Sequence, residues 1–210
     1  MEKVMEPRCL RLALMASGRG SNFLAILEAI RRGELNATIE VVISDQSEAM
    51  ALQRAEAAGI AAVFIDSRHF SDRAGYERAI IEELKPRNID LVVLAGYMRL
   101  VGKELLQAYP HRILNIHPAL LPSFTGLHAQ RQALEYGVKF SGCTVHLVDD
   151  GMDTGPIIAQ AVAPVLPGDT EDDLSDRILA REHKLYSQVL QWLAEGRVYI
   201  DGRKVFVDHD

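Results

Sequence analysis

The sequence predicts an α/β fold: a doubly wound, mostly parallel sheet with helices on both faces and an antiparallel edge. Short, nearly continuous apolar runs alternate with amphipathic segments through the first half of the chain. That pattern is typical of parallel strands buried on both faces, each followed by a crossover helix. Further on, two strand-like runs are joined by a connection too short for a crossover helix, which predicts an antiparallel pair at one sheet edge.

The composition is that of an ordinary globular protein. Of the 210 residues, 48% are apolar and 25% charged. The sequence shows no repeat, low-complexity segment or long linker, so we expect a single domain over residues 1–210. The formal net charge of -6 argues against a nucleic-acid partner, and no apolar run is long enough for a membrane helix. Cys9 and Cys143 form no CxxC pair, which indicates a reducing, cytoplasmic location. Residues 1–8 lack the apolar core of a signal peptide and are expected to be a flexible tail.

The first predicted strand, residues 10–16, runs into the glycine-rich turn SGRGSN. Ser21 or Asn22 is expected to cap the next helix, whose apolar stripe contains Phe23, Ile26, Leu27 and Ile30. Close backbone approach and a helix N-terminus together predict an anion site at Gly20, Ser21 and Asn22. A Rossmann dinucleotide fingerprint would need a third glycine at Phe23, so the turn favours a phosphate monoester over a pyrophosphate; a mere tight turn is the alternative.

The next elements continue the Rossmann-like alternation. Strands are expected over residues 38–44, 62–65, 90–95 and 112–116. Helices are expected from Ser47 to Gly59, from Ser71 and Asp72 to just before Pro86, and over about Lys103 to Ala108. Strands and helices in this alternation predict right-handed crossovers and a doubly wound sheet.

The last third of the chain departs from this alternation. A short helix is expected over residues 130–136, followed by the antiparallel strands 141–148 and 156–165. Thr170 and Asp173 resemble a capping box, which opens a long helix to Ala194. Residues 195–210 are expected to form a hairpin extension with an Asp-Gly turn. Glu182 falls on the apolar stripe of the long helix, where a carboxylate is either paired structurally or faces a ligand.

Residues 113–126, ILNIHPALLPSFTG, carry the strongest chemical signal. Asn115 and His117 stand at i and i+2 of a strand end, so both side chains can address one substrate oxygen. Asp153 lies in a glycine-flanked loop, and near His117 it would favour the imidazolium. Such a set suits acyl transfer through a tetrahedral oxyanion, with acid–base help. The alternatives are a strand-end histidine that is merely hydrogen-bonded and an aspartate that only shapes a turn.

Two other kinds of chemistry find little support. His117, His128, His146 and Asp153 are available to a metal, but no HxxxH, CxxC or HExxH spacing is present, so no metal is expected. No GxSxG elbow marks a nucleophile. Direct transfer between two bound substrates is therefore favoured over a covalent acyl-enzyme.

The motifs NIHP and LLP, at residues 115–118 and 120–122, resemble the signature of the folate-dependent formyltransferases. Residues 126–158, the SGRGSN and AGYMRL loops and the Glu182-His183 pair resemble the branch that acts on phosphoribosylglycinamide. The resemblance covers roughly residues 10–195. It implies transfer of a formyl group from 10-formyltetrahydrofolate, the co-substrate, to the amine of 5-phosphoribosylglycinamide in purine biosynthesis.

The resemblance also implies roles for individual residues. Asn115 and His117 would bind the formyl oxygen, and Asp153 would orient His117 and pass a proton. Gly20, Ser21 and Asn22 would hold the substrate phosphate, and Glu182 the ribose hydroxyls. The folate would lie against Arg73, Met98, Arg99, Leu100, Val101, Asp149, Asp150, Gly151 and Met152. The Leu121-Pro122 peptide matches a position where the family carries a cis bond.

Three alternatives differ in partner or class. The family's methionyl-tRNA enzyme and formyltetrahydrofolate hydrolase carry further domains, for which this chain is expected to have no room. A non-catalytic nucleotide-binding module would need no Asn-His-Asp set. The expected partners are small molecules only, with no nucleic acid or membrane, and the protein is expected to be a monomer or homodimer.

Overall fold

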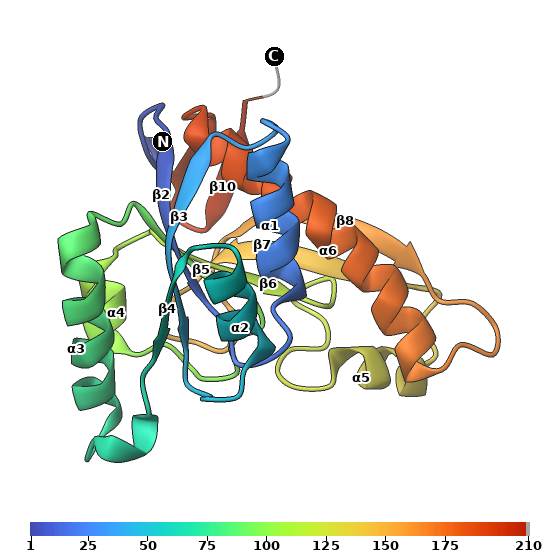
Figure 1. Cartoon of the computed structure of the whole chain (residues 1–210). Coiled ribbons are helices and arrows are strands. Elements are labelled where there is room, and N and C mark those ends of the chain that lie inside the picture. Colours follow the sequence, from blue (N-terminus) through green and yellow to red (C-terminus); the bar gives the residue numbers. More distant parts are fainter. Residues whose placement is uncertain (209–210) are drawn as a thin grey trace.

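A seven-stranded mixed sheet forms the centre of the computed structural model, which describes residues 1–208 (Figure 1). The strand order is β4-β3-β2-β5-β6-β7-β8. The strands are β2 (Leu10–Met15), β3 (Ala37–Ser44), β4 (Ala61–Phe64), β5 (Leu91–Leu94), β6 (Ile113–His117), β7 (Phe140–Leu147) and β8 (Ile157–Pro164). The first five of these pair in parallel, whereas β7 runs antiparallel to both β6 and β8. The predicted sheet and its antiparallel edge are therefore confirmed.

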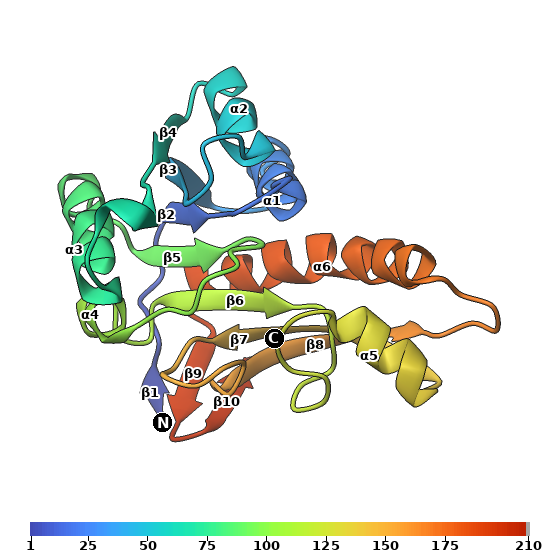
Figure 2. The same ribbon diagram turned by 90° about the horizontal axis from the view of Figure 1, so that it is seen from below.

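Helices cover both faces of the sheet, as expected (Figure 2). One face packs against α1 (Ser21–Arg31), α2 (Met50–Ala57), α5 (Ala129–Tyr136) and α6 (Glu171–Ala194). The other packs against α3 (Arg73–Leu84) and α4 (Lys103–Ala108). Short 3-10 turns lie at Ser67–His69 and Lys85–Arg87. Because the central strands β2 and β5 are buried from both sides, they read as nearly continuous apolar runs in the sequence.

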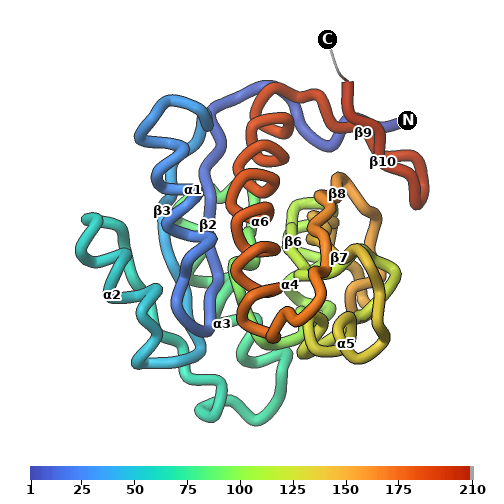
Figure 3. Tube along the Cα trace, turned by 90° about the vertical axis from the view of Figure 1, so that its right-hand side faces the viewer, coloured from blue at the N-terminus to red at the C-terminus, as the bar shows by residue number. Residues whose placement is uncertain are grey.

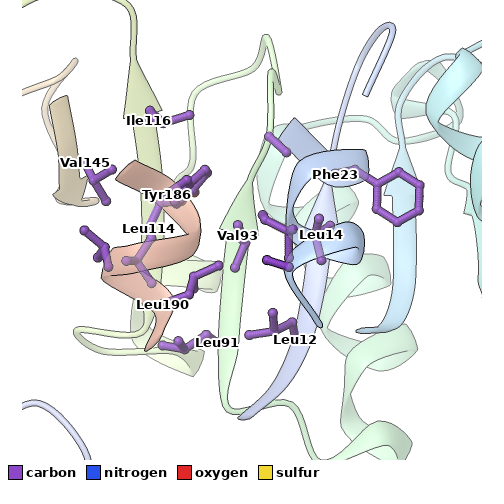
Figure 4. Close-up of a cluster of buried hydrophobic side chains, with 14 of the residues drawn as sticks. Leu12, Leu14, Phe23, Leu91, Val93, Leu114, Ile116, Val145, Tyr186 and Leu190 are labelled. Atoms are coloured by element: carbon purple, nitrogen blue, oxygen red, sulfur yellow. The ribbon is translucent and has the colours of Figure 1, made fainter. Parts of the chain in front are cut away.

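The larger core lies under α1 and α6. Phe23 of α1 and Tyr186 of α6 are both fully buried against the strands (Figure 4). The Tyr186 hydroxyl lies 3.1 Å from the carbonyl oxygens of Leu94, the last residue of β5, and of Leu114, near the start of β6, and shares its proton between them. Long helix α6 is thereby fixed to both strands. Its predicted capping box is confirmed: Thr170 and Asp173 make both reciprocal bonds.

The two ends of the chain meet in a small second sheet, β1-β9-β10 (Figure 3). Within the described residues the predicted hairpin is present as β9 (Val198–Asp201) and β10 (Lys204–Val207), and residues 209 and 210 of the expected extension lie outside them. The expectation of a flexible tail over residues 1–8 is wrong, because β1 (Glu2–Lys3) pairs antiparallel with β9. The free edge of β9 offers unpaired backbone groups, and the N-terminal segment satisfies them. No local sequence pattern signals a pairing between chain ends.

Two helix starts differ from the expectation. Gly20, in the left-handed region at φ 69°, is the N-cap of α1, so neither Ser21 nor Asn22 caps it. Helix α2 begins at Met50 after the N-cap Ala49, not at Ser47. Most other bounds agree within one or two residues, and α4 has the predicted bounds. Within residues 1–208, no helix is both long and apolar enough to cross a membrane.

Candidate active site

The candidate site lies where the strand order changes direction. From β2 the chain adds β3 and β4 on one side and then returns to place β5 on the other side of β2. In open α/β sheets, the carboxyl ends of the strands at such a switch point form a crevice that binds ligands. The loops after β2 and β5 carry the predicted phosphate turn and one folate loop, and Asn115 and His117 lie at the end of β6.

Asn115, His117 and Asp153 are brought together by the antiparallel edge. Asn115 and His117 end β6, and the loop between β7 and β8 returns Asp153 to them. Asp153 Oδ2 lies 3.4 Å from His117 Nδ1, and the two side chains are only 13% and 5% exposed. Asp153 has a positive φ of 55°, which aspartate tolerates better than most residues. The contact that the sequence could not establish is therefore present.

His117 faces an acceptor at each ring nitrogen. Its Nε2 lies 2.8 Å from the carbonyl oxygen of Phe124, and its Nδ1 faces the Asp153 carboxylate. A carbonyl and a carboxylate can only accept, so an imidazolium with both N–H groups satisfies both partners. The loop after β6 is also held by Asp153, whose Oδ2 accepts from the Gly126 amide at 2.8 Å. The Leu121-Pro122 peptide in this loop is cis, as the resemblance implies.

The site holds a second histidine that the sequence analysis did not single out as a site residue. His146 of β7 lies directly opposite Asn115 in the β6–β7 ladder, and its Nε2 is 3.1 Å from Asn115 Nδ2. Its Nδ1 is 2.9 Å from the carbonyl oxygen of Leu147. Burial lowers the pKa of His146, and the nearby Asp153 opposes this shift. A signal was available: His146 is a histidine inside a predicted strand, where a buried imidazole needs a hydrogen-bond partner or a role.

The predicted phosphate turn leads into helix α1, whose start has no side-chain cap. Helix α1 has no side-chain cap and no acidic residue in its first turn, so its N-terminal amides and dipole favour an anion. A Cβ on Gly20 would lie 2.8 Å from the Cβ of Ala51, and the positive φ also requires glycine. Glycine at position 20 is therefore required by the turn and by its packing against Ala51 of α2, and the preference for an anion rests on the start of α1.

Asn22 and Glu182 form a buried polar pair beside this turn. Asn22 Nδ2 donates to Glu182 Oε2 at 2.8 Å, across from α1 to α6. Burial raises the pKa of Glu182, while the Asn22 bond opposes the shift. Asn22 Oδ1 is buried with no hydrogen-bond partner. A buried carboxylate and an orphaned amide oxygen are suited to polar hydroxyl groups of a ligand.

The loop after β5 lies beside the phosphate turn. Ser17 Oγ donates to Asp45 Oδ1 at 2.7 Å and accepts from the Met98 amide at 3.0 Å, so it joins the ends of β2, β3 and β5. Met98, Arg99 and Leu100 are exposed, Val101 is half-buried, and the Arg99 guanidinium stacks on Tyr76, 5.3 Å from the ring centre. Arg73, also exposed, is the first residue of α3.

The second predicted folate loop connects β7 to β8. Asp149 Oδ1 accepts from the Gly151 amide at 3.2 Å and from Thr154 Oγ1 at 2.7 Å, which makes a tight turn. Asp150 and Met152 are exposed and Gly151 half-buried. Arg203 of the C-terminal hairpin donates to the Thr154 carbonyl at 2.7 Å, so the hairpin supports this loop. Across residues 1–208, no three His, Cys, Asp or Glu side chains gather to hold a metal ion.

Comparison with known proteins shows which family this chain resembles in sequence and structure. Residues 10–190 match the family described as Formyl transferase. The chain is 40% identical to the phosphoribosylglycinamide formyltransferase of Escherichia coli, over 95% of this chain and 94% of that protein. It is 44% identical to the enzyme of the same name from Bacillus subtilis, over 87% and 94%. The crystal structure of glycinamide ribonucleotide transformylase 1 from Symbiobacterium toebii superposes with a TM-score of 0.93 at 51% identity, covering 94% of this chain and 93% of that one.

Proposed function

Because the chain belongs to the formyl transferase family, we propose that Asn115, His117 and Asp153 carry out formyl transfer to the amine of 5-phosphoribosylglycinamide. The activity is that of a phosphoribosylglycinamide formyltransferase, an enzyme of purine biosynthesis. The donor is a formyl folate, 10-formyltetrahydrofolate. The 3.4 Å contact between Asp153 and His117 carries the assignment of chemistry to this set.

The phosphoribosyl substrate occupies the side of the site formed by α1 and α6. Its phosphate binds the amides of Gly20, Ser21 and Asn22 at the uncapped helix start. Its ribose hydroxyls contact Glu182 and the free Asn22 Oδ1, which explains a carboxylate on an apolar helix face. This placement leaves the substrate amine directed toward the ends of β5 and β6.

The folate occupies the side formed by the two loops after β5 and β7. Met98, Arg99, Leu100 and Val101 line it on one side, and Asp149, Asp150, Gly151 and Met152 on the other. Arg73 lies at the outer end, where a cation suits the folate's carboxylates. The support for this placement is the family membership, together with the position of the first loop after β5 and the contact of Asp153, in the second loop, with His117.

Transfer proceeds in a single active site without an acyl-enzyme. The substrate amine attacks the formyl carbon, and Asn115 and the His117 imidazolium donate to the oxyanion that forms. The bond between the formyl carbon and N10 then breaks as N10 gains a proton, and the attacking nitrogen loses one. Asp153 stabilises the imidazolium and relays that proton. For His117 Nε2 to reach the oxyanion, the Phe124 carbonyl must give up its bond.

The assay combines the enzyme, 10-formyltetrahydrofolate and phosphoribosylglycinamide, follows release of tetrahydrofolate, and identifies the product by mass. Formylated amine in an amount equal to the folate released supports the proposal. Folate release with water alone, yielding formate, would instead make the protein a hydrolase of the same family.

Three further properties belong to the proposal. They are a cytoplasmic location, supported by two free thiols, a monomeric or homodimeric state, and no metal requirement.

A further inference from the structure

Asn115 and His146 form a cross-strand pair inside the candidate site. They are direct partners in the β6–β7 ladder, so their side chains leave the same face of the sheet. The β7–β8 register shifts between Val145 and His146, which places an irregularity next to the histidine. Such irregularities are enriched beside active sites because they change the direction of a side chain.

The hydrogen bonds of His146 fix its tautomer. The Leu147 carbonyl, 2.9 Å from Nδ1, can only accept, so Nδ1 carries a proton. In a neutral imidazole, Nε2 is then an acceptor and requires a donor. The amide nitrogen of Asn115, 3.1 Å away, is that donor.

This chain of bonds fixes the orientation of the Asn115 amide. If the amide were rotated by half a turn, its oxygen would face the Nε2 lone pair, and two acceptors would meet. With the observed orientation, one Nδ2–H is bound to His146, and the second Nδ2–H is left for another acceptor.

We propose that His146 is a positioning residue, a neutral imidazole of fixed tautomer that orients Asn115 so that its amide N–H faces the formyl oxygen. This inference rests on the proposed function for its consequence in catalysis, but the tautomer and the hydrogen bond belong to the free protein. His146 does not touch the substrate; it acts through Asn115.

The surroundings of His146 favour the neutral state. Its side chain is 2% exposed, and burial lowers its pKa. The charged groups that face it are Asp153, whose Oδ1 is 3.8 Å from Nε2, Asp149 and His117. The distance to Asp153 exceeds a hydrogen bond, so the Asn115 amide is the partner within bonding reach of Nε2.

Two conservative variants separate the role of Nε2, which accepts from Asn115, from that of Nδ1, which donates to the Leu147 carbonyl. In His146→Asn, the side-chain amide can still donate to the Leu147 carbonyl, but nothing replaces Nε2. In His146→Gln, the longer amide can place an oxygen near the Nε2 position. We expect His146→Asn to lower kcat at least ~30-fold, with both KM values within ~3-fold, because one donor to the oxyanion is no longer held in place. We expect His146→Gln to recover at least ~10-fold of that loss in kcat. His111→Asn, an exposed histidine on the chain segment before β6, is the matched control and should leave kcat unchanged.

The pairing with Asn115 gives a second, independent test. In an Asn115→Ala background, His146→Asn should lower kcat by less than ~2-fold further, because there is no amide left to orient. Equal activities for the Asn and Gln variants, or losses that multiply in the double variant, would overturn the proposal.

Nitrogen NMR of the wild-type imidazole tests the inference without activity and without a variant. We expect the spectrum of a neutral ring protonated at Nδ1, with Nε2 coupled through a hydrogen bond to the Asn115 amide. A ring protonated at Nε2 would overturn the proposal. If this spectrum is found but no formyl transfer occurs, the proposed function fails while the tautomer assignment stands.

Discussion

Asp153 Oδ2 lies 3.4 Å from His117 Nδ1, and the same oxygen accepts a hydrogen bond from the Gly126 amide. One carboxylate therefore contacts both the His117 imidazole and the loop that follows β6. The Phe124 carbonyl of that loop occupies the other imidazole nitrogen. The loop after β6, His117 and Asp153 are thus one connected unit, and in the proposed mechanism the formyl oxygen replaces the Phe124 carbonyl at His117 Nε2.

Replacing Asp153 by asparagine should lower kcat at least ~100-fold, as expected for losing an acid–base group and the partner of an imidazolium. Asparagine tolerates the positive φ of this position, so the backbone need not change. Steady-state kinetics with both substrates measure the effect. Asp176→Asn, at an exposed position of α6, is the control. Near-normal turnover in a folded Asp153→Asn enzyme would remove Asp153 from the mechanism.

Replacing Glu182 by glutamine should weaken binding of the phosphoribosyl substrate and, at high pH, increase the stability of the protein. Glu182→Gln should raise the KM for phosphoribosylglycinamide at least ~10-fold with little change in kcat, since a ribose contact acts in the ground state as well. An exposed glutamate of α5, Glu135, serves as the matched Gln control. A variant with normal KM and a lower stability would show that Glu182 only pairs with Asn22.

The stability of the Glu182→Gln variant relative to wild type should increase with pH. Burial raises the folded-state pKa of Glu182 above its ordinary value, so the protonated form is favoured by folding. Its contribution to stability is fully present below the ordinary glutamate pKa and is lost as pH rises through the raised one. Urea unfolding should find the two proteins similar near about pH 4 and the variant relatively more stable near about pH 8. A difference independent of pH would contradict the shift.

Tyr186→Phe should cost about 1–2 kcal/mol of unfolding free energy, because the one buried hydroxyl proton that the Leu94 and Leu114 carbonyls share is lost. Tyr136→Phe is the control, since Tyr136 is 80% exposed. Urea denaturation measures both. If the two variants lost the same free energy, the hydroxyl bonds from α6 to β5 and β6 would not contribute to stability.

The two thiols should differ in reactivity. Cys9 is exposed, whereas Cys143 is buried, and burial raises the pKa of its thiol to about 12. A thiolate-selective reagent should therefore modify one cysteine in the native protein and two after denaturation. In a Cys9→Ser variant, native protein should not react; rapid labelling of Cys143 would contradict its burial.

Local patterns in the sequence predicted most of the fold. Continuous apolar runs identified the strands, and the Thr170 and Asp173 spacing identified the start of α6, because both signals depend on neighbouring residues. The pairing of β1 with β9 and the cap at Gly20 were not predicted. The first joins opposite ends of the chain. The second depends on the positive φ of Gly20, and the sequence is equally compatible with a cap by Ser21 or Asn22.

The candidate site was predicted by residue but not by geometry. The type and spacing of Asn115 and His117 indicated donors to one oxygen, with Asp153 as a candidate partner of His117, and the family resemblance supplied the role of Glu182. The partners of these residues could not be predicted. His146 faces Asn115 through strand register, and the Phe124 carbonyl reaches His117 through a loop with positive φ at Phe124 itself. Both depend on tertiary structure.

The most direct test of formyl transfer between two bound substrates is a rapid-quench experiment with a formyl donor labelled at the formyl carbon. Enzyme and donor are mixed without acceptor, quenched, and examined by intact-protein mass; phosphoribosylglycinamide is then added in a parallel run. We predict no formylated enzyme and no formate without the amine, and labelled product in one turnover once the amine is present. Accumulation of a formyl-enzyme, or release of labelled formate before the amine is added, would contradict direct transfer at Asn115, His117 and Asp153.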